Sequence, residues 1–247
     1  MAGQTELPGA RIDVRKWREF LKSDLGGAWT DDEITTLSKP WPSQVQTALT
    51  LGPDCYCFVA FSGHGCDGAV ALHDHYQEFP ISSLKPKTNR AAIVIDACRG
   101  PAELMSFSAS RKVAMANEYL GEAVAIQAGQ AKSLDQSPYA RALVVMNRLT
   151  RTSNHRTRWD TALNSTLKGT VEMLACAKGQ DSNEHRFSGG YYTTLLMQSA
   201  DRWDQRSTQP GTHSTKDAHD YAASLLPPQQ TPEYSPSWLD FPFAVKI

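Results

Sequence analysis

Two short, uninterrupted apolar runs constrain this sequence more than any other feature. Residues 55–61 read Cys-Tyr-Cys-Phe-Val-Ala-Phe, and residues 91–95 read Ala-Ala-Ile-Val-Ile. Turn-forming or polar residues bound each run on both sides. Runs this short, apolar on both faces, are typical of parallel strands buried between layers of helices.

Helical and strand-like patterns alternate around these two runs. We expect helices over residues 12–25, from Thr30 to before Pro40, and over 43–51, 138–150 and 192–203. Asp13 is a plausible cap for the first, and Thr30 with Glu33 has capping-box spacing. Further strands are expected at 69–72, 121–128, 171–175 and 241–245. This alternation predicts an α/β fold: one domain over 1–247 with an open, mostly parallel β-sheet flanked by helices on both faces.

Charge and cysteine content exclude several classes of function. The chain has 25 Lys and Arg against 26 Asp and Glu, so it has no basic excess for binding nucleic acid. Its apolar runs are far shorter than the ~20 residues that a membrane helix needs, and we expect no membrane partner. The start has no basic or apolar leader pattern, and five cysteines do not form a disulfide framework. We therefore expect reduced thiols in a cytoplasmic protein.

Chemistry-bearing residues follow both apolar runs directly. The first run leads into Ser-Gly-His-Gly at 62–65, and the second into Asp-Ala-Cys-Arg-Gly at 96–100. Reacting groups collect at the carboxyl ends of parallel strands. If the two strands are neighbours, about 4.8 Å apart, the imidazole of His64 and the thiol of Cys98 can meet.

A thiol beside an imidazole has a clear chemical use. The imidazole can take the thiol proton, and the thiolate can then attack an amide carbonyl while the imidazole protonates the leaving amine. The glycines around His64 leave room for a substrate. The backbone N–H groups of Gly65 and Cys98 are the natural donors for the oxyanion that forms.

These motifs resemble those of a known family. Residues 62–65 and 96–100 are similar to the His-Gly and Gln-Ala-Cys-Arg-Gly motifs of caspases and their bacterial and metacaspase relatives. Residues 174–184 and 189–196 look like the family's later core strand, its loop and the following helix. Residues 229–233, Gln-Gln-Thr-Pro-Glu, resemble a Gln-x-Pro element of bacterial members.

The resemblance implies a caspase-like, three-layer fold and a cysteine endopeptidase that acts on protein substrates. Carried over by position, Cys98 is the nucleophile, His64 the general base and acid, and Gly65 and Cys98 the oxyanion donors. The chemistry requires no cofactor and no metal, and calcium activation is left open. The family suggests a role in regulated cell death or defence.

Residues 101–168 form the least regular part of the sequence and could contain an exposed loop. The arginines there could line a solvated face or be sites at which the protein processes itself: Arg141, Arg148, Arg151, Arg156 and Arg158.

The residue two places before the nucleophile suggests the substrate preference. Caspases have Gln there and select Asp at P1, the residue before the cleaved bond, whereas this chain has Asp96. Glu184 lies where metacaspase-like relatives place a second acidic residue. Carboxylates in a pocket repel an acidic substrate and pair with Arg or Lys, so we expect cleavage after basic residues. Since Arg99-Gly100 is the caspase ending, Asp at P1 is the alternative.

Other interpretations of these residues are simpler. Asp96 could cap a helix, Glu184 could be a solvated loop carboxylate, and the other cysteines are expected to be core thiols. A zinc site from Cys55, Cys57, His64 and Cys66, and a metal pair from His73 and His75, are alternatives to the absence of a metal.

One departure from the family concerns the sheet. Members usually begin with a core strand before the turn that Leu7-Pro8-Gly9 resembles, and residues 1–6 are too polar and short to form it. The chain is then a fragment, or the sheet lacks a strand, or another chain supplies one by pairing at an exposed sheet edge. A catalytically silent caspase-like module that binds or regulates other proteins is therefore the second functional hypothesis.

Overall fold

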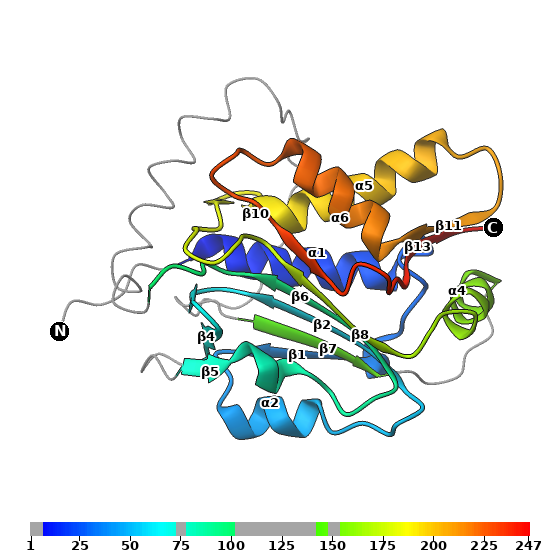
Figure 1. Cartoon of the computed structure of the whole chain (residues 1–247). Coiled ribbons are helices and arrows are strands. Elements are labelled where there is room, and N and C mark those ends of the chain that lie inside the picture. The colour runs from blue at the N-terminus through cyan, green and yellow to red at the C-terminus, as the bar shows by residue number, and fades with distance from the viewer. Residues whose placement is uncertain (1–6, 73–77, 102–141, 148–153) are drawn as a thin grey trace.

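The computed structural model describes residues 7–72, 78–101, 142–147 and 154–247. Its centre is a six-stranded sheet with helices on both faces (Figure 1). The strands, in spatial order, are β1 (Ile34–Ser38), β7 (Ala142–Asn147), β2 (Tyr56–Ser62), β6 (Arg90–Asp96), β8 (Gly169–Leu174) and β12 (Glu233–Ser235). The two apolar runs thus form β2 and β6, neighbours at the centre of the sheet.

Strand directions confirm an open, mostly parallel sheet, although its pairings are mixed. β2, β6 and β8 are parallel to one another. β7 is antiparallel to both β1 and β2, so β1 runs in the same direction as β2. The last strand, β12, is antiparallel to β8. Four of the six strands therefore point the same way.

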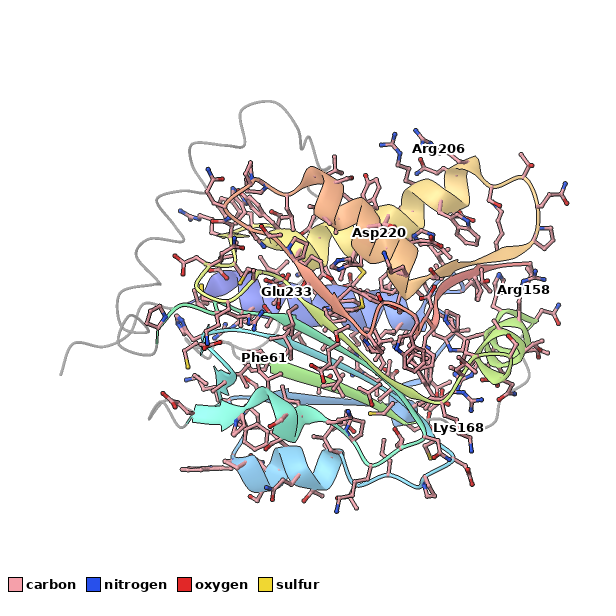
Figure 2. The ribbon with its side chains drawn as sticks, in the orientation of Figure 1. Phe61, Arg158, Lys168, Arg206, Asp220 and Glu233 are labelled. Atoms are coloured by element: carbon pink, nitrogen blue, oxygen red, sulfur yellow. The ribbon has the colours of Figure 1, made fainter. Side chains whose placement is uncertain are left out.

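Two apolar cores, one on each face, hold the layers together. Helices α1 (Pro8–Lys22), α5 (Tyr191–Arg206) and α6 (Thr215–Leu225) cover one face, and α2 (Pro42–Ala48) covers the other (Figure 1). Along β2 the side chains alternate as in any strand. Phe58 packs in the core that includes Trp17 of α1. Val59 and Phe61 pack in the core that includes Val45 of α2; Phe61 is labelled in Figure 2.

Short strands and one further helix complete the described fold. A three-stranded sheet contains β3 (Gly65–Cys66), β4 (Ala69–Ala71) and β5 (Glu78–Pro80), and two ribbons pair β9 (Glu184–His185) with β10 (Gly189–Gly190) and β11 (Gly211–Ser214) with β13 (Pro242–Lys246). Helix α4 (Asn154–Asn164) contributes Trp159 and Leu163 to the core on the α1 face. The strands expected at 69–72, 171–175 and 241–245, and the helices expected at 12–25, 43–51 and 192–203, are confirmed within a few residues.

Two helix predictions are wrong. Only a 3-10 turn, η1 (Asp31–Glu33), follows Thr30 before β1 begins. The cap itself forms, since Glu33 Oε2 accepts from the backbone N–H of Thr30 at 3.0 Å, but the β-branched residues that follow favour a strand. Within the expected helix 138–150, residues 142–147 form β7, because a continuous apolar run in the sequence gives no period to distinguish the two structures.

Strand β7 lies between β1 and β2, second from one edge of the sheet. The chain itself therefore supplies the strand beside β2, from residues that follow β6. The sheet edges are β1 and β12, and pairing of a partner chain there stays a prediction.

The basic residues expected in an exposed processing loop have different surroundings. Arg156 is fully buried and pairs with Glu33 at 2.7 Å, and Arg158 donates to the carbonyl oxygen of Gly211. Arg156 is therefore not accessible to a peptidase in the folded protein. Arg141, Arg148 and Arg151, the strand expected at 121–128, and His73 and His75 lie outside the described residues. Self-processing within 101–168 stays a prediction.

The described residues offer no membrane-spanning helix and no metal cluster. No helix within the described ranges is long and apolar enough to cross a membrane. In the same ranges, no cluster of three or more His, Cys, Asp or Glu side chains could hold a metal ion. All five cysteines lie in the described residues and none forms a disulfide, and four of them are buried: Cys57, Cys66, Cys98 and Cys176.

Candidate active site

Strand register brings the His64 and Cys98 loops to one place. β2 and β6 pair in parallel with Ser62 opposite Asp96, the last residue of each strand. His64 and Cys98 each follow two residues later. The loops stay joined beyond the strands, because the N–H of Gly63 donates to the carbonyl oxygen of Asp96 at 3.2 Å. The sequence-based requirement that these two strands be neighbours is met.

Gly65 lets the two loops approach closely. A Cβ atom at this position would lie 2.7 Å from the carbonyl oxygen of Cys98 and 2.9 Å from Cβ of Ala97. Any larger residue would therefore push the His64 loop off the Cys98 loop. The use of the Gly65 and Cys98 N–H groups as oxyanion donors stays a prediction.

A third loop, after β8, covers the thiol. The N–H of Ser182 points at Sγ of Cys98 at 3.4 Å, and its carbonyl oxygen is 3.9 Å from the same sulfur. The N–H of Arg99 donates to the carbonyl oxygen of Gln180 at 2.9 Å. Cys98 is 2% exposed and His64 is 4% exposed. An N–H aimed at sulfur stabilises a thiolate, whereas a carbonyl oxygen beside the same sulfur accepts from a thiol, so the Ser182 backbone can contact Cys98 in either protonation state.

Asp96 is hydrogen-bonded to Ser182, the residue whose backbone contacts Cys98. It is 3% exposed, and its Oδ1 accepts from the hydroxyl of Ser182. Its Oδ2 accepts from the N–H of Thr193 at 3.0 Å and from the Thr193 hydroxyl at 2.9 Å. Because strand alternation puts residues 58, 60 and 62 on the α1 face, the equivalent residues 92, 94 and 96 share it, and Asp96 meets the start of α5 there. Residues 97–101 form no helix that Asp96 could cap, so that interpretation is wrong; Asp96 instead accepts from the first turn of α5.

Asp13 is a second buried carboxyl beside Asp96, and its position differs from the sequence-based expectation. It lies within α1 rather than capping it, and it is fully buried. It accepts from the Ser62 hydroxyl at 2.6 Å and from the N–H of Gly190 at 2.9 Å. Burial, and next the negative charge of Asp96, raise the pKa of Asp13 to about 8. Its spacing from Trp17 was the signal in the sequence, since residues four apart share a helix face and that face is buried.

Glu184 is buried on the other side of the same turn. It is 5% exposed, so the interpretation as a solvated loop carboxylate is wrong. It pairs with Gly190 across the β9–β10 ribbon. A Cβ at Gly9 would lie 2.7 Å from Glu184 Oε2, which places this carboxylate against the first turn of α1. A helix N-terminus favours a negative charge there. Whether Glu184 contacts a substrate stays a prediction.

The absence of side chains at Gly189 and Gly190 leaves room for the carboxyl groups of Asp13 and Asp96. A Cβ at Gly189 would lie 2.0 Å from Asp13 Oδ1, and a Cβ at Gly190 would lie 2.1 Å from Asp96 Oδ2. Gly189 also has φ +80°, a conformation that favours glycine. The loop of residues 182–190 therefore contacts Cys98 at one end and the buried carboxyl groups at the other.

A known protein family matches most of the chain. The family model for the caspase domain matches residues 2–242 of this chain. No curated protein matches the chain.

Proposed function

The chain belongs to the caspase-domain family, and we propose that it is a cysteine endopeptidase that uses Cys98 and His64 to cleave proteins after basic residues. The observation that carries the proposal is the paired register of Ser62 and Asp96, which sets the two motif loops side by side. The packing of Gly65 on the Cys98 carbonyl supports it.

In the first half of the reaction, His64 takes the proton of Cys98 and the thiolate attacks the carbonyl carbon of the substrate. The carbonyl oxygen becomes an oxyanion, for which the N–H groups of Gly65 and Cys98 are the proposed donors. As the C–N bond breaks, the imidazolium returns its proton to the leaving amine. The new amino terminus departs, and the rest of the substrate remains as a thioester on Cys98.

In the second half, water replaces the amine. Neutral His64 takes a proton from the water as its oxygen attacks the thioester carbon. The C–S bond then breaks, a carboxyl group leaves, and the sulfur regains a proton from His64. All of this uses groups of the protein and water.

The acidic groups support a basic P1 residue. Asp96 is linked to Cys98 through a single residue, Ser182, and Asp13 lies beside Asp96. Since the pKa of Asp13 is about 8, this carboxyl is mainly protonated at neutral pH, and the charge of an arriving guanidinium would favour its ionisation. An acidic P1 side chain would add a further negative charge beside the buried carboxyl groups of Asp96 and Asp13. We infer Arg or Lys at P1, with Glu184 as a further acidic contributor.

Peptide cleavage tests the proposal. Purified protein should release a fluorophore from peptides ending in Arg or Lys, with and without calcium, and Cys98→Ala should abolish release. A set of peptides that differ only at P1 should rank Arg and Lys first, and a preference for Asp would refute the role of the carboxyls. Mass spectrometry of the incubated protein would reveal self-cleavage after Arg141, Arg148 or Arg151.

The burial of Cys98 and His64 favours one other function. Because the two residues are almost covered, a module that binds other proteins without cleaving them is the second candidate. It predicts that wild type and Cys98→Ala are equally silent on every peptide. A role in cell death or defence is proposed on family membership alone.

A further inference from the structure

Gln230 lies far from the nucleophile in sequence but contacts the loop that covers it. It is 1% exposed and lies in the chain segment before β12. Its side-chain oxygen accepts from the N–H of Asn183 at 3.0 Å and from the Asn183 amide nitrogen at 2.9 Å. Its nitrogen donates to the carbonyl oxygen of Ala175 at 3.1 Å and lies 3.4 Å from the Ser182 hydroxyl. Every one of these bonds ends on residues 175–183.

Ser182 connects the hydrogen bonds of Gln230 to Cys98 and Asp96. Its backbone N–H points at the sulfur of Cys98, and its hydroxyl donates to Asp96. One residue therefore contacts both the nucleophile and the carboxylate proposed for substrate selection. A small displacement of Ser182 would change both contacts, since hydrogen bonds weaken steeply with distance and angle.

The same C-terminal segment holds the loop at two further points. The N–H of Thr231 donates to the side-chain oxygen of Gln180 at 2.7 Å. Glu233 on β12 pairs with Arg99, the residue after the nucleophile (Figure 2). The segment 230–233 thus contacts the loops on both sides of Cys98. Gln230 differs from the other two contacts in being buried and in reaching Ser182.

We propose that Gln230 is a positioning residue that acts through Ser182 and sets both the reactivity of Cys98 and the recognition of the P1 side chain by Asp96. The part that concerns P1 rests on the proposed function. The part that concerns Cys98 does not, because the ionisation of a thiol can be measured without a substrate. Gln230 touches neither the sulfur nor Asp96 directly, so its effect must pass through the loop.

The chain offers a matched control one residue away. Gln229 is exposed, whereas Gln230 is buried. Gln230→Met keeps the length of the side chain and removes its hydrogen bonds, and Gln229→Met makes the same chemical change at the surface. The rate at which iodoacetamide modifies Cys98, read by peptide mass spectrometry from about pH 5 to pH 9, reports its thiolate fraction.

The expected result separates the two contacts of Ser182. Gln230→Met should move the midpoint of the Cys98 profile up by about one pH unit and slow modification about tenfold at neutral pH, since one unit is a tenfold change in ionisation. It should also raise KM for Arg peptides. Ser182→Ala retains its N–H and loses its hydroxyl, so it should raise KM about tenfold and leave the Cys98 profile unchanged. Gln229→Met should match wild type throughout.

Several results would overturn the proposal. Superimposable profiles for Gln230→Met and Gln229→Met, a Ser182→Ala profile shifted like that of Gln230→Met, or no modification of wild-type Cys98 at any pH would each do so. If Gln230→Met does not fold, Asn183→Ala decides instead. It removes one donor to Gln230 and should give a smaller upward shift, and an unshifted profile would refute the proposal. If no variant or wild type cleaves peptides, the proposed function fails while the Cys98 profiles still test Gln230.

Discussion

Gly190→Ala is the substitution whose effect the structure fixes most closely. The φ of Gly190 is −63°, so alanine can adopt this backbone without strain. Its Cβ would lie 2.1 Å from Oδ2 and 2.6 Å from Cγ of Asp96, where ordinary contact begins near 3.4 Å. The carboxylate must therefore move by more than about 1 Å, since the opposing atom of alanine is attached to backbone.

The cost follows from the bonds that this movement breaks. Oδ2 of Asp96 accepts both the N–H and the hydroxyl of Thr193. Hydrogen bonds to charged groups contribute about 1.5–3 kcal/mol each, so losing both should lower the free energy of unfolding by about 3–6 kcal/mol. That is a large share of the about 5–15 kcal/mol that stabilises a typical domain.

Urea unfolding can measure this loss against a matched control. The midpoint should fall at an unchanged slope. Gly52→Ala makes the same chemical change where a Cβ would meet only the sulfur of Cys55, at 3.7 Å, and should alter stability by less than about 0.5 kcal/mol.

A double-mutant cycle tests the cause. In an Asp96→Ala background the obstructing carboxylate is absent, so Gly190→Ala should then cost less than about 1 kcal/mol. An equal cost in both backgrounds would show that Asp96 is not what alanine displaces, and the reasoning would be refuted.

Four other substitutions give further tests. Asp96→Asn should lower kcat/KM for Arg peptides about 10–100-fold relative to peptides with an uncharged P1 residue, because it removes the charge and one acceptor; an unchanged ratio would remove Asp96 from the pocket. The pKa of Asp13 is about 8 in the fold against an ordinary value of 3.8, so its stabilising effect is complete below about pH 4 and is lost as the pH rises to about 8. Asp13→Asn should flatten that decline in the urea midpoint, and an identical decline would exclude Asp13 as its source. Arg156→Ala removes the cation that pairs with the buried Glu33 and should cost about 3–5 kcal/mol in the same assay, whereas Arg158→Ala loses one bond to a carbonyl oxygen and should cost about 1 kcal/mol; equal losses would contradict the distinction.

The centre of the sheet could be predicted because its physical signal is local. β2 and β6 are apolar on both faces and end in residues that a strand does not favour, so their type and their end points were readable. The neighbouring strands β1 and β7 were misread as helices. The apolar run at 142–147 has no periodicity that separates a strand from a helix, and its pairing with β2 decides between them. β1, in which Thr35 and Thr36 are exposed, is fixed as a strand by its β-branched residues and by its pairing with β7.

The candidate site also combines features that local sequence predicts with features that depend on tertiary contacts. The neighbouring positions of the His64 and Cys98 loops could be predicted because each motif adjoins its strand, whereas their joint role as a catalytic pair stays a prediction. Asp13 was noticed only as a cap, although its place on the apolar face of α1 was visible in the helical spacing. The link from Gln230 to Ser182 had no signal in sequence, since it joins residues 48 positions apart through one buried amide. Contacts of that kind depend on tertiary packing, which a single sequence does not encode by pattern.

The account depends most directly on Cys98 and His64 acting as one nucleophilic pair. A peptide chloromethyl ketone with Arg at P1 tests this, because it alkylates a cysteine only after binding as a substrate does. The account predicts a single adduct on Cys98, formed much more slowly in His64→Ala and outcompeted by an Arg peptide. Adducts spread over the other cysteines, or an equal rate on Cys98 with and without His64, would contradict it.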